Sequence, residues 1–251
     1  MSLFAQYCRK TLIELLSLIP ASSLEKQIHR VISYRLKSLK PADALKFLFR
    51  IDAFIYALQG QKAVEYGGGV HTKHRHLQYH DFFVDRIKRG EKVLDIGCGI
   101  GALAYSVADR AAAYVTGIDL SADNIAKAQE RFTHPRVSYQ IGDVLTWMPT
   151  KSFEVVILSN VLEHLPKRSN FLKNVQRNLN PKRYLIRVPL FEREWRVPLK
   201  QELGVEWRLD PTHQIEYTLD GFVKEITAAG MRVIHNQIQW GEIWAEVIPG
   251  A

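Results

Sequence analysis

The sequence predicts an α/β fold in which a mostly parallel sheet follows an N-terminal helical segment. Two observations support this prediction. Up to about residue 60, apolar residues recur at the three- and four-residue spacing of amphipathic helices. After residue 90, short runs rich in β-branched residues alternate with stretches of helical spacing, the pattern of parallel β-α-β units.

Glycines mark the boundary between the two parts. Pro41 is expected to open a helix that ends just before Gly60, since proline is well tolerated in a first helical turn. Gly60 and the glycines at 67–69 then interrupt the helical pattern. We therefore expect an N-terminal helical segment over residues 1–62 and a second domain over residues 63–251.

The second domain is expected to contain seven strands and four helices. The predicted strands are Lys92–Ile96, Tyr114–Asp119, Arg136–Ile141, Phe153–Leu158, Tyr184–Val188, Met231–Gln239 and Glu242–Val247. The predicted helices are Gly101–Arg110, Ala122–Phe132, Phe171–Asn178 and Leu219–Ala229. The last two strands form an expected antiparallel pair around Trp240-Gly241, and the polar, aromatic stretch Phe191–Leu209 is expected to be a loop.

Composition is that of a soluble globular protein, with 47% hydrophobic and 24% charged residues among 251. No apolar run approaches the roughly 18 residues that span a bilayer. Residues 1–20 lack the features of a secretory signal. The two cysteines, Cys8 and Cys98, lie too far apart in sequence to suggest a disulfide framework. A cytoplasmic location is expected.

The net charge of +8 is concentrated in the N-terminal segment. Residues 1–62 hold ten Lys or Arg and four Asp or Glu, a net charge of +6. A basic surface attracts nucleic acid, anionic lipid or an acidic substrate, although a solvated helix face accounts for it equally well. Weak association of a Met1–Ile19 helix with a membrane surface is a less favoured alternative, because this segment carries little charge.

The most informative stretch joins an apolar strand to a glycine-rich turn and then a helix, over Val93–Gly101. Glycines are needed there because the chain turns sharply and a ligand must approach the backbone closely. Gly97, Gly99 and Ala102 also fit the loose dinucleotide pattern G-x-G-x-x-A, so NAD binding competes at this point.

Three further segments follow in order at the ends of the predicted strands. Asp119, followed by Leu120, ends the second strand, where a carboxylate can accept hydrogen bonds from both ribose hydroxyls of a nucleotide. Gly142–Val144 ends the third strand, and Ser159–Leu165 leaves the fourth with the sequence Ser-Asn-Val-Leu-Glu-His-Leu. Together with Asp95 before the glycines, these segments resemble the class I S-adenosylmethionine (SAM)-dependent methyltransferase family.

The resemblance implies a Rossmann-like, seven-stranded, mostly parallel sheet whose last strand is antiparallel, and SAM as the cofactor. The cofactor-binding residues that it implies are Asp95, Gly97, Gly99, Gly101, Asp119, Leu120, Asp143, Val144 and Asn160. Structural alternatives stay open, since each aspartate is also suited to cap a turn or a helix.

Three histidines are candidates for the acceptor site. A hydroxyl acceptor must lose a proton, and histidine is a common general base. His213 lies in a Thr-His-x-x-x-Tyr-Thr segment that resembles one in many small-molecule and sugar methyltransferases. We expect His213 and His164 to line the acceptor pocket, with His213 as general base and His80 as a third candidate. Alternatively, His164 and His213 fix their loops.

No metal site is expected. Four histidines cluster before the first strand, but Lys73 and Arg75 among them would repel a cation; the four are His71, His74, His76 and His80. One family branch binds magnesium-like ions through a Glu-x-x-Glu-His motif. This chain has Asn160 in place of the first glutamate, so that metal is not carried over.

The expected function is SAM-dependent O-methylation of a small-molecule or glycan hydroxyl. An RNA methyltransferase acting on ribose or an RNA end, aided by the basic N-terminus, is the first alternative. A cofactor-binding interaction module without catalysis is the second. An NAD-dependent oxidoreductase would leave the resemblances at Gly142–Val144 and Asn160–His164 unexplained. The oligomeric state stays open.

Overall fold

The computed structural model describes residues 18–146, 149 and 151–250. The chain divides into two compact units, the first ending at Tyr56 and the second running from Ala57 to Ala251. Cys8, and residues 1–17 of the segment Met1–Ile19, lie outside the described residues. Within those residues, no helix has both the length and the apolarity needed to cross a membrane.

The first unit contains helix α2 (Ala21–Leu36) and the larger part of α3 (Pro41–Tyr66), up to Tyr56. Pro41 begins α3 as predicted. The expected end before Gly60 is wrong, because the helix continues through this glycine to Tyr66. One glycine in a long helix costs only about 1 kcal/mol relative to alanine, too little to end it. The glycines at 67–69 follow its actual end.

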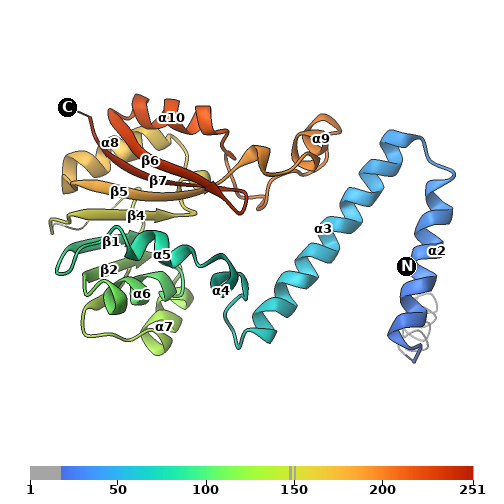
Figure 1. Ribbon diagram of the computed structural model, residues 1–251, viewed down its shortest axis with the longest axis horizontal. Helices are drawn as coiled ribbons and strands as arrows, with labels where there is room; N and C mark the ends of the chain where they lie inside the picture. Colours follow the sequence, from blue (N-terminus) through green and yellow to red (C-terminus); the bar gives the residue numbers. More distant parts are fainter. Residues whose placement is uncertain (1–17, 147–148, 150, 251) are drawn as a thin grey trace. The chain divides into compact units, whose positions relative to one another are not determined.

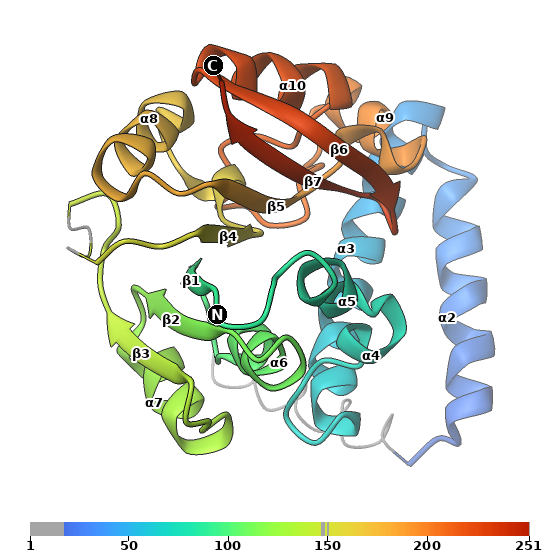
Figure 2. The ribbon, with the colours of Figure 1, turned by 60° about the vertical axis from the view of Figure 1, so that its left-hand side comes forward.

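The second unit is built on a seven-stranded sheet in the order β3-β2-β1-β4-β5-β7-β6 (Figures 1 and 2). β7 pairs antiparallel with both β5 and β6, and the other neighbouring strands of the described sheet pair in parallel, which confirms the predicted mostly parallel sheet with an antiparallel last strand. The strands are β1 (Lys92–Ile96), β2 (Tyr114–Asp119), β3 (Val137–Ile141), β4 (Val155–Ser159), β5 (Arg183–Pro189), β6 (Met231–Gln239) and β7 (Glu242–Pro249). The strand order reverses between β1 and β4, the place where open α/β sheets bind ligands.

Helices cover both faces of this sheet (Figure 2). α5 and α6 pack on one hydrophobic core, and α8 and α10 pack on the other. The helices are α4 (Lys73–Leu77), α5 (Tyr79–Val84), α6 (Ala102–Arg110), α7 (Ala122–Arg131), α8 (Arg168–Leu179), α9 (Arg196–Glu202) and α10 (Leu219–Ala228), with short 3-10 turns η1 (Leu162–His164) and η2 (Phe191–Arg193). Alternate residues of β4 enter opposite cores, so this strand is apolar without interruption.

The segment that follows β5 also differs from its prediction. The stretch Phe191–Leu209, expected as a loop, contains η2 and α9. Val197 anchors α9 because its side chain is buried, although the residues around it are mostly polar. A single apolar anchor is too little periodicity for a helix to be recognised from sequence.

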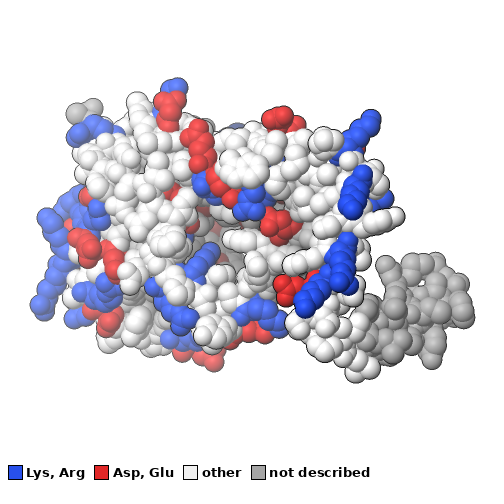
Figure 3. Space-filling model, turned by 45° about the vertical axis from the view of Figure 1, so that its right-hand side comes forward, with Lys and Arg blue, Asp and Glu red and all other residues white. Residues whose placement is uncertain are grey.

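Charged side chains of both signs are interspersed over the molecular face in Figure 3. The excess of basic residues therefore does not gather there into a region of one sign. A tract dominated by Lys and Arg is the usual electrostatic footprint of a nucleic-acid-binding surface.

Candidate active site

The turn between β1 and α6 depends on three glycines with left-handed backbone angles. Gly97, Gly99 and Gly101 have φ values of 68°, 55° and 84°. A Cβ at Gly97 would lie 2.6 Å from Cγ2 of Val161, and one at Gly101 would lie 2.6 Å from the hydroxyl oxygen of Tyr139. Nothing lies within 4 Å of the corresponding position at Gly99. Packing therefore requires two of the glycines, whereas the backbone at Gly99 is open to a ligand.

Asp119 joins the end of β2 to this turn. The backbone N–H of Gly99 donates to its Oδ2 at 2.8 Å. The backbone N–H of Ser121 and the side-chain amide of Asn124 donate to Oδ1 at 2.9 and 3.2 Å. Each carboxylate oxygen has two lone pairs; both on Oδ1 are used, and one on Oδ2 remains to accept a ribose hydroxyl. The structural role and the predicted cofactor role are therefore compatible.

The next predicted residues follow β2 and the neighbouring strand β3. Leu120 is 70% exposed, an unusual position for leucine that leaves its side chain available to a flat ring. Oδ1 of Asp143 accepts the backbone N–H of Leu145 at 2.9 Å, which gives it a turn-forming role. Val144 is buried. These residues lie at the same edge of the sheet as Asp119.

A pocket of about 250 Å³ opens beside the glycine turn. It is lined by Lys73, His74, Tyr79, Asp95, Gly97, Cys98, Gly99, Ile100, Ala102, Leu103, Ser159 and Arg187. A larger hollow of about 430 Å³ lies around the amino ends of β1, β2 and β3 and includes none of the predicted site residues. The smaller pocket is the better site because it lies at the carboxyl ends of β1 and β4.

Asp95 is the acidic group of this pocket. Its side chain is buried, and its Oδ2 has no hydrogen-bond partner in the described part of the chain. Burial, with the charge of Asp119 as a second cause, raises the pKa of Asp95 to about 8. A buried carboxyl without a partner would be satisfied by a cationic ligand group.

A basic and aromatic group from α4, α5 and β5 also lines the pocket. Arg187 is buried and donates to both carboxylate oxygens of Glu242, at 2.5 and 2.7 Å. Its guanidinium carbon lies 3.9 Å from the centroid of the Tyr79 ring, whose hydroxyl is 2.9 Å from Nδ1 of His74. Burial, and then the charge of Arg187, lowers the pKa of Lys73. The pocket thus presents both a carboxyl and cationic groups.

The sequence analysis did not select Arg187, although the sequence carries a signal for it. It stands as a lone charge in the otherwise apolar run Tyr184–Pro189. A charge in the middle of a buried parallel strand is rare unless it is paired. Its partner, Glu242, could not be identified because it comes from β7, which is 55 residues away in sequence.

Asn160 adopts a left-handed conformation, with φ of 57°, immediately after β4. Its backbone N–H donates to the carbonyl oxygen of Arg187 at 2.8 Å. Its buried Oδ1 has no partner among the residues that the structure describes. This oxygen is an acceptor available to a ligand beside Ser159, which lines the pocket.

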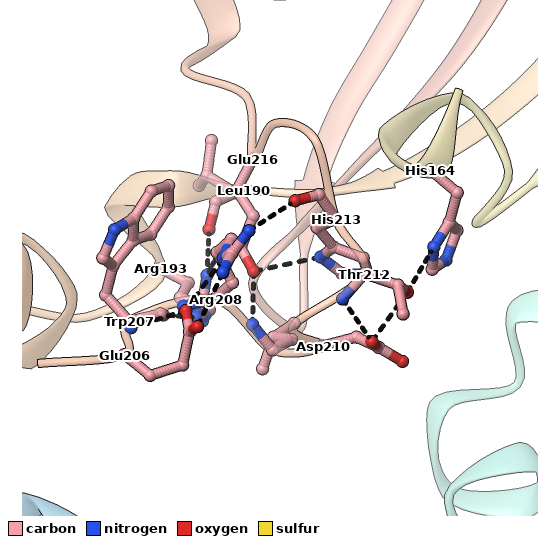
Figure 4. Close-up of polar contacts among 11 residues, drawn as sticks. His164, Leu190, Arg193, Glu206, Trp207, Arg208, Asp210, Thr212, His213 and Glu216 are labelled. Atoms are coloured by element: carbon pink, nitrogen blue, oxygen red, sulfur yellow. Dashed lines mark hydrogen bonds and ion pairs between the residues drawn. The ribbon is translucent and has the colours of Figure 1, made fainter. Parts of the chain in front are cut away.

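His164 and His213 lie together although they come from different loops (Figure 4). Their ring centroids are 4.6 Å apart and the rings are nearly perpendicular, at 80°. Nδ1 of His164 is 2.9 Å from Oγ1 of Thr212, and Nδ1 of His213 is 3.2 Å from Oε1 of Glu216. Burial, with His213 as a second cause, lowers the pKa of His164 and favours the neutral ring. The two histidines expected at the acceptor site therefore lie side by side, although neither lines the pocket beside the glycine turn.

Glu163 belongs to the same group, and the sequence analysis did not select it. Its side chain is fully buried, and neither carboxylate oxygen has a hydrogen-bond partner in the described residues. Burial raises its pKa to about 8. Each of Glu163, His164 and His213 offers one potential metal-ligand atom. These three atoms lie within 4.8 Å of one another. His213 lies about 50 positions after His164 in the sequence, so the three side chains come together only when the chain folds.

His80 lies in a different group. Its ring packs edge-on against those of Tyr79 and His74, with centroids 4.5 and 5.9 Å away. Burial lowers the pKa of His80 to about 4, so the ring is neutral. The described contacts of His80 include neither His164 nor His213. Its neighbours Tyr79 and His74 line the pocket beside the glycine turn.

Comparison with known proteins finds similarity to methyltransferases. Residues 93–182 match the family model described as "Methyltransferase domain". The chain is 28% identical over 177 residues to a 2-methyl-6-phytyl-1,4-hydroquinone methyltransferase of Synechocystis sp., a match that covers 66% of this chain and 54% of that protein. It is 29% identical over 143 residues to a ubiquinone biosynthesis O-methyltransferase of Glaesserella parasuis, covering 54% and 60%. The chain thus spans about half the length of these relatives.

A solved structure agrees with the sequence relatives. Magnesium protoporphyrin IX methyltransferase from Synechocystis with bound SAH superposes with a TM-score of 0.56 at 18% identity, covering 70% of this chain and 84% of that one. At this identity the likeness concerns the fold alone.

The sheet order, the glycine turn and Asp119 define a Rossmann-like domain that binds an adenosine-containing cofactor. The match of residues 93–182 to the methyltransferase-domain model, with the named relatives, supports the expected class I SAM-dependent methyltransferase and SAM as its cofactor.

The pocket fits this cofactor. The amino-acid end of SAM carries an ammonium and a carboxylate, which match the unpartnered Asp95 and the cationic groups of Lys73 and Arg187. Asp119, beside the glycine turn, would accept a ribose hydroxyl, and the open side of Gly99 would admit close approach to the backbone. When bound, SAM supplies a methyl group on a positively charged sulfur.

Proposed function

We propose that the protein transfers the methyl group of SAM to a hydroxyl of a small molecule or a glycan. In this reaction the hydroxyl oxygen attacks the methyl carbon, the carbon–sulfur bond breaks, and its electron pair stays on sulfur. The products are a methyl ether, S-adenosylhomocysteine and a proton. The observation that carries the proposal is the His164–His213 pair on loops after β4 and β5, at the edge of the sheet where the cofactor pocket opens.

The cofactor contacts in this proposal are those of the predicted set. They are Asp95, Gly97, Gly99, Gly101, Asp119, Leu120, Asp143, Val144 and Asn160, to which the pocket adds Lys73 and Arg187. Gly101 contributes through the shape of the turn, because its α-carbon faces the ring of Tyr139.

At the proposed acceptor site, His164 and His213 lie where the acceptor hydroxyl loses its proton. Holding the acceptor in line with the methyl group supplies much of the rate, and removing the proton supplies more. His80 supports the cofactor pocket by packing against Tyr79 and His74, which line it. In the simplest mechanism, His213 acts as the general base and removes the proton from the acceptor hydroxyl.

The name of one relative, a ubiquinone biosynthesis O-methyltransferase, supports an oxygen acceptor, and that of another, a 2-methyl-6-phytyl-1,4-hydroquinone methyltransferase, supports a small-molecule acceptor. A small-molecule acceptor and a cytoplasmic location are parts of the proposal. We further propose that residues 63–251 are sufficient for cofactor binding and that residues 1–62 are accessory.

Calorimetric titration of the purified chain with SAM, S-adenosylhomocysteine and NAD tests the cofactor part. Release of S-adenosylhomocysteine in the presence of catechols, simple glycosides and short RNAs then tests the acceptor part. Methylation of a catechol or sugar hydroxyl is the expected result. Methylation of RNA alone would replace the acceptor class, and SAM binding without transfer to any of these acceptors would count against catalysis on them.

A further inference from the structure

We propose that the hollow at the amino ends of β1, β2 and β3 binds a small ligand that carries a chain of two or three phosphates. This amino-edge hollow has a volume of about 430 Å³. It is lined by Lys92, Tyr114, Val115, Thr116, Pro135, Arg136, Val137, Ser138, Lys151, Ser152 and Phe153. The cofactor pocket lies at the opposite edge of the sheet, so binding in the hollow does not depend on the proposed function.

The charge of the lining is positive. Lys92, Arg136 and Lys151 contribute three cations, and no aspartate or glutamate is among the described residues that line the hollow. Glu154, which follows Phe153 in sequence, accepts the backbone N–H of Lys92 at 2.7 Å and does not line the hollow. On the molecular face in Figure 3, by contrast, charges of both signs are interspersed. Cations that gather without a counter-charge repel one another, and a bound anion relieves this repulsion.

Arg136 gives the most specific indication of a ligand. Its side chain is half-buried, and no hydrogen bond or ion pair from the described residues reaches its guanidinium. Its backbone is fixed, since its N–H donates to Nδ1 of His134 at 3.1 Å and its carbonyl oxygen accepts the N–H of Val115 at 2.8 Å. A half-buried charge is normally paired, because it has lost part of its hydration. Phosphate is a suitable acceptor, since a guanidinium can donate two parallel hydrogen bonds to its oxygens.

The floor of the hollow is a polar part of the sheet. Thr116 of β2 pairs with Leu94 of β1 and with Ser138 of β3, so these three side chains lie on one face. Leu94 is buried in the core that α8 and α10 cover, whereas Thr116 and Ser138 lie outside that core with their hydroxyl oxygens 3.3 Å apart. Hydroxyl groups at this position can donate hydrogen bonds to the oxygens of an anion.

The spacing of the cations suits a chain of phosphates better than a single one. Lys92 begins β1 and Arg136 precedes β3, two strand spacings or about 10 Å away. Lys151 comes from the segment before β4. Cations separated in this way can each meet a different phosphate. Tyr114, which pairs with Lys92 and is 55% exposed, also offers a flat ring on which a nucleobase can stack.

The hollow is separate from the cofactor pocket. Lys92 lies at the start of β1, whereas Asp95 and Gly97 line the cofactor pocket towards and beyond its end. From Lys92 to Gly97 the chain rises about 16 Å. The two sites have no lining residue in common in the part of the chain that the structure describes. A phosphate ligand in the hollow is therefore a second ligand bound together with SAM, and it is not the methyl acceptor.

Calorimetric titration of the full chain tests this site, with S-adenosylhomocysteine in excess to occupy the cofactor pocket. The probes are inorganic triphosphate, pyrophosphate and GTP, with inorganic phosphate for comparison. One equivalent of triphosphate should bind, more tightly than phosphate does, and its affinity should fall with added salt. Equal affinities for triphosphate and GTP would identify the phosphate chain as the recognised group. Tighter binding of GTP that is lost in Tyr114→Ala would identify a nucleotide.

Variants of the lining cations locate the ligand. Arg136→Gln should weaken triphosphate binding about 10- to 100-fold, the effect of losing hydrogen bonds to a charged group. Arg136→Lys should retain more affinity because it keeps the charge, and Lys92→Gln/Lys151→Gln should lose about as much as Arg136→Gln. The matched controls are Arg232→Gln on β6 and Lys173→Gln on α8, which remove exposed cations outside the hollow and should leave affinity unchanged.

The melting temperature provides a second measurement. Triphosphate should raise it in the unmodified chain and not in Arg136→Gln. Without ligand the two proteins should melt at the same temperature, because the Arg136 side chain has no partner in the described residues to lose.

Three results would overturn the site. They are absence of triphosphate binding at low salt, equal losses of affinity in Arg136→Gln and Arg232→Gln, and displacement of triphosphate by S-adenosylhomocysteine. The second would show attraction by net charge alone, and the third would place the ligand in the cofactor pocket. Binding of a short RNA but of none of the small anions would also overturn it. Methyl transfer is not measured in these experiments, so failure of the proposed function would leave their outcome unchanged.

Discussion

The backbone N–H of Gly99 donates a 2.8 Å hydrogen bond to Oδ2 of Asp119, which is 20 residues away in sequence. The bond joins the turn after β1 to the end of the neighbouring strand β2. The same carboxylate also accepts the backbone N–H of Ser121. Asp119 therefore shapes the glycine turn in addition to its proposed role in binding the ribose.

Removing this carboxylate should weaken cofactor binding. Hydrogen bonds to a charged group contribute about 1.5 to 3 kcal/mol, so Asp119→Ala is expected to reduce SAM affinity roughly 10- to 100-fold. Calorimetry measures the change. Asp123→Ala, at an exposed acidic position in the first turn of α7, is the matched control and should leave affinity within about twofold. Equal affinities for the two variants would contradict the proposed role of Asp119.

The glycines of the turn should respond differently to substitution. A left-handed alanine costs about 1 to 2 kcal/mol, and at position 97 its Cβ would also overlap Val161. Gly97→Ala should therefore lower the melting temperature more than Gly99→Ala. The latter should lose at least about 10-fold in SAM affinity, because its Cβ enters the open space proposed for the cofactor.

Gly90→Ala separates backbone strain from ligand contact in this series. Gly90 has φ of 80° with nothing within 4 Å of its Cβ position, and it precedes β1. Its melting temperature should fall about as much as that of Gly99→Ala while SAM affinity is unchanged. Normal SAM affinity in Gly99→Ala would argue that the cofactor lies elsewhere.

Cofactor binding should be coupled to proton release at Asp95. The pKa of this carboxyl is raised to about 8 in the free protein, so it is protonated at pH 7. The ammonium of SAM favours the ionised form, and SAM affinity should therefore rise with pH until about 8 and then level off. Calorimetry at pH 7 in buffers of different ionisation enthalpy measures the released proton. Asp95→Asn should abolish the dependence on buffer; an unchanged dependence would assign the proton to another group.

The free protein should lose stability as pH rises towards 8. The pKa values of Asp95 and Glu163 are both raised to about 8, compared with about 4 for unfolded carboxyls. The associated stabilisation is complete below about pH 4 and is lost as pH rises through about 8. Melting temperatures from pH 5 to 8.5 should fall less steeply in the double variant Asp95→Asn/Glu163→Gln. Parallel profiles would show that neither carboxyl controls this slope.

Removing one partner of the buried pair of Arg187 and Glu242 should reduce stability more than replacing both partners with apolar residues. Glu242→Leu leaves a buried guanidinium unpaired and should cost about 3 to 5 kcal/mol in urea unfolding. Arg187→Met/Glu242→Leu should recover much of this loss, since apolar side chains can replace a buried pair. SAM affinity should stay reduced because Arg187 lines the pocket.

An exposed pair provides the comparison. Lys224 lies 2.7 Å from Asp220 on α10, where both side chains are about three-quarters exposed. Lys224→Met should change the unfolding free energy by less than about 1 kcal/mol. A double variant at Arg187 and Glu242 that is no more stable than Glu242→Leu would refute the explanation based on an unpaired charge.

Local patterns were sufficient to predict most of the sheet. Lys92–Ile96, Tyr114–Asp119 and Met231–Gln239 have the bounds that the sequence predicted, because runs of apolar and β-branched residues are bounded there by turn residues. The short helices α4 and α5 carried too little periodicity to be predicted before β1. The helical end expected at Gly60 was wrong because one glycine costs only about 1 kcal/mol, too little to end a long helix.

The sequence by itself determined the α/β fold class, the glycine turn and the acidic residues at the strand ends, because each follows from short stretches of the chain. Only the tertiary structure placed Glu163 against His164 and His213, and Arg187 against Glu242. These residues come from different strands and loops, so their contacts depend on strand order and on burial. Among the described residues, burial also left Oδ2 of Asp95 and both carboxylate oxygens of Glu163 without hydrogen-bond partners, a condition that no local pattern encodes.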